Sequence, residues 1–334
     1  MRKGRILVVG SLVMDLITAT KCFPQSGATV LGASFSTAPG GKGANQAVQA
    51  ARLGADVTMV GRVGADAFGE TLIDSARKAG IHVGRIAREE TEPSAIGNII
   101  LEATENGSTQ NRIIVVPGAN MKLDEGDIAH LAEDITSYDA VMLQLEIPMA
   151  VNEQVAALAH RAGVSVILNP APAAALSDEI IRNTTYLAPN ESEATALTGL
   201  PIGRSGDTVD LADAERVAKA LLQRGTSCVI LTLGSAGALY ARDGNTTFVP
   251  AVPGVKVADP TAAGDSFLGA FAAAVSAGFS DLDAVRFANC VAAVTVSKHG
   301  AQPSLPKLEA VLPLLAGAYG HSFAAAFTKG QKNG

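Results

Sequence analysis

Short, uninterrupted apolar runs alternate with helix-like segments along most of this chain. Residues 6–9 are all apolar, as expected for a strand buried on both faces of a sheet. Residues 44–51 carry alanine and valine at helical spacing, and Gly54 follows as a helix stop. The alternation continues with strand-like runs at 57–60, 140–145, 164–168 and 228–233 and helix-like segments at 72–76, 150–162 and 211–224. It predicts an α/β fold with a mostly parallel sheet and helices on both faces.

The composition excludes several classes of protein. The 26 basic and 32 acidic residues give a net charge of −6, and the absence of a Lys/Arg run argues against nucleic-acid binding. No segment approaches the roughly 20 apolar residues that a membrane span needs. The five histidines form no HxxxH or HxH pair, which argues against a zinc site. The three cysteines show no CxxC spacing. An odd number of scattered cysteines is typical of proteins in a reducing cytosol, where they serve as small core residues, so we expect a soluble, cytoplasmic protein.

Three regions fall outside the alternation. Residues 16–38 and 94–118 contain short β-like pieces without a partner helix. They occur where ligand loops are expected, so they predict a small β lid, and an edge hairpin that covers the sheet is the alternative. Residues 316–334 are rich in Ala, Gly and Lys and predict a poorly anchored helix or tail.

The most informative motif is Asp-Pro-Thr-Ala-Ala-Gly-Asp-Ser-Phe at residues 259–267, directly before an Ala-rich helical pattern. Small residues at a helix start let backbone N–H groups approach an anion closely, and the helix dipole favours negative charge there. Asp265 stands in that first turn, where a phosphate would bind. This placement predicts a catalytic base beside a phosphoryl group. A carboxylate that only stabilises the helix dipole is the alternative.

A second motif, Gly-Gly-Lys-Gly-Ala-Asn-Gln-Ala at 40–47, is a glycine-rich turn that opens an amphipathic helix. The GxxxxGKS/T spacing of a nucleotide P-loop is missing, and Gly43 rather than Ser or Thr follows Lys42. The motif therefore predicts a polar small molecule held by backbone amides, Lys42 and Asn45. A helix-start turn with an exposed lysine is the alternative.

Polar residues also follow several predicted strands, at the edge where open α/β sheets bind ligands. Asp15 follows the first strand, and it either accepts hydrogen bonds from sugar hydroxyls or is an ordinary turn residue. Glu146 directly follows the strand-like run at 140–145. Asn190 and Glu193 open a helix, either to suit its dipole or to organise Mg²⁺ and its waters. The glycine-rich turn at 232–237 predicts a nucleotide site, although any hairpin with glycines has this pattern.

The motifs at 40–47 and 259–267 resemble the two signatures of the ribokinase-like (PfkB) carbohydrate kinases. Further blocks in the same order strengthen the resemblance, namely Gln-Leu-Glu at 144–146, Asn-Pro-Ala-Pro at 169–172, Pro-Asn-Glu at 189–191, Thr-Leu-Gly at 232–234 and Lys-His-Gly-Ala-Gln-Pro-Ser at 298–304. The resemblance covers residues 1–313 and leaves 314–334 as a C-terminal extension. It implies a three-layer α/β/α sandwich with a mostly parallel central sheet and a small β lid, and the lids of two subunits often join in a homodimer.

The resemblance also implies roles for individual residues. Asp265 matches the catalytic base, and the backbone of Ala262, Ala263 and Gly264 matches an anion hole for the transferred phosphoryl group. The positions that bind the sugar are matched by Val13, Asp15, Gly41, Lys42, Asn45, Glu146 and Asp265. The positions that bind ATP are matched by Asn190, Thr232, Gly234, Ser235, Gly237, Gly264 and Asn289. The positions tied to Mg²⁺ are matched by Asn190 and Glu193, and those of a K⁺ site, mainly through backbone oxygens, by Asp259, Thr261, Thr295, Lys298, Gly300 and Ser304.

These roles imply ATP-dependent phosphorylation of the 5-hydroxyl of a pentose such as D-ribose. Ribose-specific relatives usually carry Asn at the place of Val13, where it bonds sugar hydroxyls on the C2 side. Valine offers no donor or acceptor, so an unpaired 2-hydroxyl would lose about 1–3 kcal/mol, and 2-deoxyribose is an alternative substrate. A kinase for another furanoside, such as a nucleoside or fructose, is a further alternative. The presence of Asp265 argues against a sugar-binding regulator that has lost catalysis.

Overall fold

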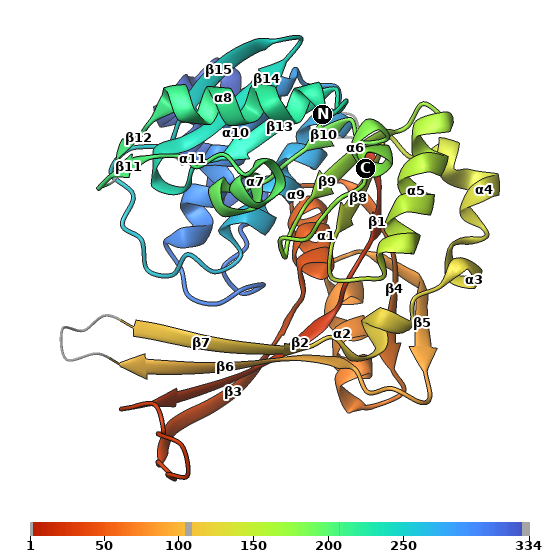
Figure 1. Ribbon diagram of the computed structural model, residues 1–334, viewed down its shortest axis with the longest axis vertical. Coiled ribbons are helices and arrows are strands. Elements are labelled where there is room, and N and C mark those ends of the chain that lie inside the picture. The colour runs from red at the N-terminus through yellow and green to blue at the C-terminus, as the bar shows by residue number, and fades with distance from the viewer. Residues whose placement is uncertain (1–2, 104–108, 207, 329–334) are drawn as a thin grey trace.

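The computed structural model describes residues 3–103, 109–206 and 208–328. Within them, nine strands form one large sheet in the order β15-β14-β13-β10-β9-β8-β1-β4-β5 (Figure 1). Their bounds are β1 Arg5–Val9, β4 Asp56–Gly64, β5 His82–Glu89, β8 Ala140–Gln144, β9 Ser165–Asn169, β10 Tyr186–Leu187, β13 Cys228–Thr232, β14 Gly237–Arg242 and β15 Asn245–Pro250. The strands from β5 to β13 in this order are parallel, and β14 and β15 add an antiparallel edge.

Both faces of the main sheet are buried under helices. Along β1, Ile6 and Val8 belong to one hydrophobic core, whereas Leu7 and Val9 belong to the other. The first core includes side chains of α1 Lys42–Arg52, α2 Ala67–Lys78, α9 Ala263–Ser276, α10 Asp281–Val296, α11 Leu308–Tyr319 and α12 His321–Ala326. The second includes side chains of α3 Glu125–Ile128, α4 Leu131–Asp134, α5 Met149–Arg161, α6 Asp178–Arg182, α7 Glu191–Thr198 and α8 Leu211–Gln223. The predicted α/β/α sandwich is confirmed.

Short elements complete the described chain. They are the 3₁₀ helices η1 Gly118–Lys122, η2 Ile135–Ser137 and η3 Gly234–Ala236 and the paired strands β11 Arg204–Ser205 and β12 Thr208–Val209. Among the described helices, none combines the length and the apolar character needed to cross a bilayer. Cys228 and Cys290 are buried as predicted, but Cys22 is exposed and is not a core residue.

The lid is a separate four-stranded sheet, in the order β3-β2-β6-β7, that projects from the body (Figure 1). Its strands are β2 Val13–Thr20, β3 Gly32–Gly40, β6 Ala95–Ala103 and β7 Thr109–Val116. These strands pair with one another, antiparallel at both edges and parallel between β2 and β6. The alternative of an edge hairpin on the main sheet is therefore wrong. Residues 104–108 of the predicted lid lie outside the described residues.

The end of the described chain is anchored by an aromatic side chain. Phe327 is fully buried, and its ring stacks on Phe279 and Phe287 at centroid distances of 4.1 and 4.2 Å. The prediction of a poorly anchored tail is therefore wrong for residues 316–328, because one buried phenylalanine holds an otherwise Ala-rich segment. The predicted boundary between residues 313 and 314 falls inside α11, so the division into a kinase domain and an extension stays a prediction. Residues 329–334 lie outside the described residues.

Candidate active site

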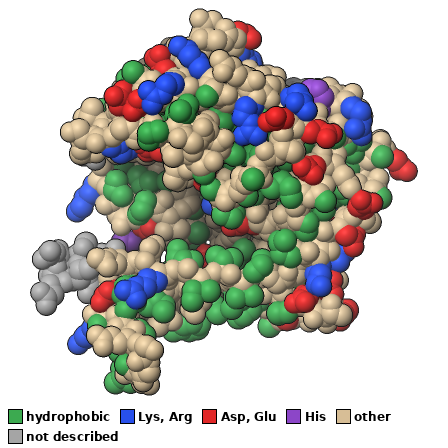
Figure 2. Space-filling model, viewed as in Figure 1, with side chains coloured by type: hydrophobic (Ala, Val, Ile, Leu, Met, Phe, Trp, Pro, Cys, Tyr) green, Lys and Arg blue, Asp and Glu red, His purple; other side chains and the backbone are tan. Residues whose placement is uncertain are grey.

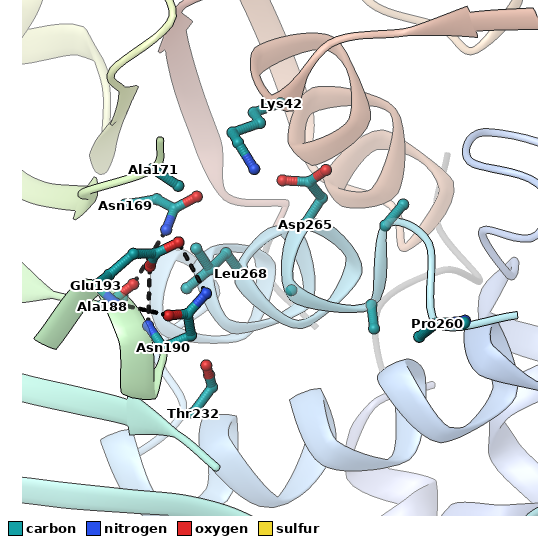
Figure 3. A pocket seen from close by; sticks show the side chains of 13 residues that line it. Lys42, Asn169, Ala171, Ala188, Asn190, Glu193, Thr232, Pro260, Asp265 and Leu268 are labelled. Atoms are coloured by element: carbon teal, nitrogen blue, oxygen red, sulfur yellow. Dashed lines mark hydrogen bonds between the residues drawn. The ribbon is translucent and has the colours of Figure 1, made fainter. Parts of the chain in front are cut away.

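A polar cavity of about 180 Å³ lies at the carboxyl ends of the parallel strands. Its lining includes Asn169 at the end of β9, Asn190 at the N-cap of α7 and Thr232 at the end of β13. The first turn of α9 lines it as well and contributes Asp265 (Figure 3). The molecule is hollowed between the lid and the body (Figure 2). The sheet edge and the start of α9 therefore meet where an open α/β sheet binds ligands.

The start of α9 presents free backbone amides. Ala262 caps the helix with a φ of 59°, a left-handed conformation that costs a non-glycine residue about 1–2 kcal/mol. Among the described residues, no acceptor takes the N–H groups of Gly264 and Asp265, whereas that of Ala263 donates to the Pro260 carbonyl at 3.2 Å. A Cβ added at Gly264 would meet nothing within 4 Å. Of the predicted anion hole at Ala262, Ala263 and Gly264, the Ala263 amide is therefore not free, because the turn before the helix uses it. Gly264 offers a free N–H as predicted, and Asp265 adds a free donor that the sequence did not predict.

Two side-chain amides hold the Asp265 carboxylate. Asn45 Nδ2 donates to Oδ2 at 2.9 Å, and Gln46 Nε2 donates to Oδ1 at 3.1 Å. The residue is only 8% exposed. Burial raises the pKa of this carboxyl, although Lys42 and the two amides act in the opposite direction. A desolvated carboxylate with a raised pKa accepts a proton more readily, which suits a general base.

Lys42 brings positive charge to the same cavity. Burial lowers the pKa of its ammonium, but the carboxylates of Asp265, Glu146 and Glu193 outweigh that effect and raise it. Its side chain points into the cavity beside Asp265 (Figure 3). The ammonium therefore remains charged at the place where the sequence predicts negatively charged groups of the ligand.

Glu146 fixes the start of α1. It follows β8, and its Oε2 accepts hydrogen bonds from Ser11 Oγ at 2.6 Å and from the Lys42 backbone N–H at 3.0 Å. Gly41 precedes the helix with a φ of 90°, and a Cβ there would lie 3.1 Å from the Ser11 carbonyl oxygen. The structure thus brings together three of the predicted sugar positions, Gly41, Lys42 and Glu146.

Asp15 and Val13 lie on one face of lid strand β2. A Cβ added at Gly97 of the neighbouring β6 would lie 2.6 Å from Asp15 Oδ1 and 3.8 Å from Val13 Cγ1. Burial raises the pKa of Asp15 to about 7, and the charges of Glu146 and Asp265 add to the shift. Asp15 is therefore electrostatically coupled to the Asp265 carboxylate, and Val13 is the apolar neighbour of Asp15.

Asn190 and Glu193 satisfy each other as a capping box of α7. Asn190 Oδ1 accepts from the Glu193 N–H at 2.9 Å, Glu193 Oε2 accepts from the Asn190 N–H at 2.9 Å, and Asn190 Nδ2 donates to Glu193 Oε1 at 2.8 Å. Burial raises the pKa of Glu193, against the effects of Asn190 and Lys42. In the described parts of the chain, no three His, Cys, Asp or Glu side chains are grouped to hold a metal ion. The pair therefore offers a single carboxylate at the cavity wall.

The turn predicted to bind nucleotide leads to a second cavity. Thr232 lines the first cavity, and η3 follows between Gly234 and Gly237, whose φ values are 54° and 124°. Ser235 lines a neighbouring cavity of about 380 Å³. The other members of its lining are largely apolar and include Val209, Phe248, Pro250, Ala251, Val252 and Pro253. An apolar cavity beside a polar one suits a ligand with a flat base and a charged chain.

Asn289 supports the wall of the second cavity. Its Nδ2 donates to the carbonyl oxygens of Val249 and Pro250, each at 3.2 Å, and the residue is buried. Pro250 lines the second cavity, and Asn289 itself is not among the residues that line either cavity. Asn289 would therefore contribute to nucleotide binding by holding the end of β15 in place, not by touching the nucleotide.

Asp259 joins the two loops predicted to hold a monovalent cation. Its Oδ1 accepts from the Thr261 N–H at 2.9 Å, and its Oδ2 accepts from the Gly300 N–H at 2.8 Å. Burial raises the pKa of Asp259, but these hydrogen bonds outweigh that effect and lower it. The remaining members of the predicted set are the buried Thr295 and Ser304 and the exposed Lys298. The structure places these two loops side by side.

Sequence reasoning missed two buried amides of the site. Asn169 lines the cavity, and Gln46 bonds to Asp265. Both occur in motifs that the sequence makes visible, at 169–172 and 40–47. A neutral amide gives no signal of charge, and only the fold brings these side chains to the carboxylate.

The fold and this site define a class of protein. The family described as pfkB family carbohydrate kinase matches residues 3–308, and the chain belongs to this family. It is therefore a carbohydrate kinase, as its motifs predict.

Individual relatives match nearly the whole chain. The ribokinase of Schizosaccharomyces pombe is 39% identical over 311 residues, which cover 91% of this chain and 95% of the relative. The deoxyribokinase of Salmonella typhi is 34% identical over 305 residues, with coverage of 91% and 96%. The structure of Arabidopsis thaliana ribokinase complexed with ribose and ATP is 33% identical, has a TM-score of 0.84, and covers 94% of this chain and 99% of that one.

The substitution Asp15→Asn tests the buried carboxylate cluster. Because folding raises the pKa of Asp15 from 3.8 to about 7, the native state keeps a proton that the unfolded state releases, and stability falls as pH rises through that window. The amide variant lacks this loss. Between pH 4 and pH 8, the free energy of unfolding should fall in the wild type and fall less in the variant. The difference between the two falls should reach up to about 4 kcal/mol. Urea unfolding at the two pH values measures this difference, and identical pH dependence in both proteins contradicts the prediction.

Proposed function

We propose that this protein transfers the γ-phosphoryl group of ATP to the 5-hydroxyl of a pentose, with D-ribose as the first substrate to test. One observation carries the proposal: the desolvated carboxylate of Asp265 and the free amides of Gly264 and Asp265 occur in one turn at one cavity. Phosphoryl transfer to an alcohol needs a proton acceptor and donors for the developing charge at one point. The similar ribokinases, one of them complexed with ribose and ATP, support the choice of substrates.

The reaction assigns one role to each group. The 5-hydroxyl oxygen attacks the γ-phosphorus, the bond from this phosphorus to the bridging oxygen breaks, and ADP leaves. Asp265 accepts the hydroxyl proton, a role worth about 10²–10⁴ in rate. The N–H groups of Gly264 and Asp265 and the dipole of α9 stabilise the charge on the phosphoryl oxygens. The sugar hydroxyls are held by Asp15, Gly41, Lys42, Asn45 and Glu146.

The two neighbouring cavities suit the two ends of ATP. We assign the phosphates to the polar cavity beside Lys42 and the adenine to the apolar cavity beyond Ser235. Asn190 and Glu193 fit Mg²⁺ only together with phosphate oxygens and water, which is the usual arrangement for this ion. When bound there, Mg²⁺ would neutralise phosphate charge.

The loops joined by Asp259 fit a monovalent cation, which we propose to be K⁺. The predicted set offers carboxylate, hydroxyl and carbonyl oxygens, the ligands that hard cations prefer. Asp259 already joins Thr261, which lies just before α9, to Gly300 in the other loop. A cation there would shape the anion hole without touching the substrate, and it would be held by Asp259, Thr261, Thr295, Lys298, Gly300 and Ser304.

The substitution Asp265→Asn tests the assignment of the base. We expect kcat to fall by about 10²–10⁴, because the amide cannot accept the proton. Pentose binding, measured by calorimetry, and the circular dichroism spectrum should change little. The measurement is release of ADP with and without pentose. Near-normal turnover in the variant would remove Asp265 from the role of base.

A 2-deoxypentose is the second candidate substrate, and the position of Val13 favours it. Val13 is 4% exposed and lies beside Asp15 on the lid face that borders the sugar positions. It offers no hydrogen bond to a 2-hydroxyl, so a 2-deoxy sugar leaves no polar group unpaired there. The similar deoxyribokinase of Salmonella typhi supports this alternative.

The substitution Val13→Asn separates the two substrates. The new amide can bond a 2-hydroxyl, so the ratio of kcat/KM for ribose to that for 2-deoxyribose should rise by about tenfold or more. Val13→Leu is the matched control, because its side chain is similar in shape to asparagine and carries no donor. A ratio that stays unchanged in the Asn variant, or rises equally in the Leu variant, removes Val13 from the control of specificity.

The lid is also the surface that we propose for homodimer formation. Its edge strand β7 exposes Ile113, Ile114, Val115 and Val116, each 45–64% accessible. β7 pairs with β6 on one side, and among the described residues no strand pairs with its other side, so apolar side chains reach solvent on both faces of a strand with one open edge. On the face shown in Figure 2, hydrophobic side chains cover part of the lid surface. An exposed apolar edge of this kind pairs readily with another chain.

Sedimentation velocity tests this dimer. We expect the wild type to sediment as a dimer and Ile114→Asp to sediment as a monomer, because a charge on the edge strand opposes pairing. Met121→Asp is the control, since Met121 is exposed but lies outside the four lid strands. A monomeric wild type, or a dimeric Ile114→Asp variant, contradicts the assignment.

A further inference from the structure

We propose that Gln46 is a positioning residue for the base: a buried chain of side-chain amides holds one oxygen of the Asp265 carboxylate and keeps it ready to accept a proton. The inference rests on the proposed function of Asp265 and deepens it. Gln46 does not line the cavity, and none of the predicted roles includes it.

Every polar atom of the Gln46 side chain has a partner. Its Nε2 donates to Asp265 Oδ1 at 3.1 Å and to Asn169 Oδ1 at 3.3 Å, and its Oε1 accepts from Gln144 Nε2 at 2.7 Å. The residue is 1% exposed, so no solvent can replace these partners. Gln46 therefore links α1, β8, β9 and α9 at the carboxylate.

The neighbours allow only one orientation of this amide. Asn169 Nδ2 donates to the Ala188 carbonyl at 3.2 Å, so Asn169 must turn its Oδ1 toward Gln46. A flipped Gln46 would place its oxygen against this Oδ1 and against the Asp265 carboxylate. These two clashes between acceptors make the flip unfavourable, whereas the amide of Gln144, whose Oε1 has no partner among the described residues, could turn with Gln46. The backbone carbonyl of Ala188 thus fixes a donor on the base.

The donor acts on a carboxylate in a strongly charged setting. Four charged groups interact electrostatically with Asp265. They are Lys42 on α1, Glu146 after β8, Asp15 on β2 and Glu193 on α7. Burial raises the pKa of Asp265, and the hydrogen bond from Gln46 opposes this rise because it stabilises the charged form. Removal of the donor should therefore raise the pKa further.

The test is the dependence of kcat on pH in Gln46→Met, with saturating pentose and ATP. Methionine is similar in length and carries no donor. The acidic limb of the profile, where the base becomes protonated, should move to higher pH by about one unit, and the plateau at high pH should change only a few-fold. A limb at the wild-type pH, or an equal loss of kcat at every pH, overturns the proposal.

A neighbouring glutamine provides the matched control. Gln49 lies one turn further along α1, is fully buried, and donates to the Pro306 carbonyl at 2.9 Å rather than to the base. Gln49→Met removes an equally buried amide from the same helix, so it should leave the acidic limb in place. A shift as large as that of Gln46→Met would show a general effect of packing and would overturn the proposal.

A second substitution, Gln46→Glu, covers the case in which the methionine variant does not fold. Two carboxylates at this distance cannot both ionise readily, so the acidic limb should move upward by more than in Gln46→Met. An unmoved limb again overturns the proposal. Asp265→Asn, assayed in parallel, separates the two claims: high activity there rejects the base itself, whereas loss of activity there with an unmoved limb in the Gln46 variants rejects only the positioning role.

Discussion

The close approach of α1 and α9 is the contact on which the site depends. Gly269 permits it, because a Cβ at this position would lie 2.6 Å from the Gln46 carbonyl oxygen and 2.8 Å from the Gln49 Cβ. At this separation the amides of Asn45 and Gln46 on one helix reach the carboxylate of the other. A larger residue at 269 would push α9 away and separate the Asp265 carboxylate from the two amides that bond to it. A glycine four residues beyond Asp265 is thus part of the site, although it cannot touch a ligand.

The charges of the site carry a cost to stability that binding can offset. Asp15, Glu146 and Asp265 are three carboxylates near one another, and Lys42 supplies positive charge among them. Burial and mutual repulsion raise the pKa of Asp15 and of Asp265. Sugar hydroxyls donate hydrogen bonds to carboxylates, so a bound pentose would replace part of the solvation that these groups lost on folding. Backbone strain at the cap of α9 is a second cost to stability at the site. Ala262 keeps an unfavourable φ directly before the turn with the free amides.

Much of this could be predicted from the sequence, for identifiable reasons. The buried strands are continuous apolar runs, and the helices carry periodic apolar residues, so the layers follow from pattern alone. The place of Asp265 at the cavity could be predicted, because a charged residue among small residues at a helix start is unusual. The loss of the Ala263 amide to Pro260 could not, because it depends on the exact path of the turn. The anchoring by Phe327 depends on two rings from distant segments, which no local pattern reveals.

The most direct measurement is a crystal structure with ribose, ADP, Mg²⁺ and aluminium fluoride as a mimic of the transferred phosphoryl group. We expect fluoride atoms within about 3 Å of the backbone nitrogens of Gly264 and Asp265. We also expect the 5-hydroxyl oxygen within about 3 Å of the Asp265 carboxylate. A fluoride group bound away from the start of α9, or a sugar whose 5-hydroxyl faces another residue, would contradict these expectations.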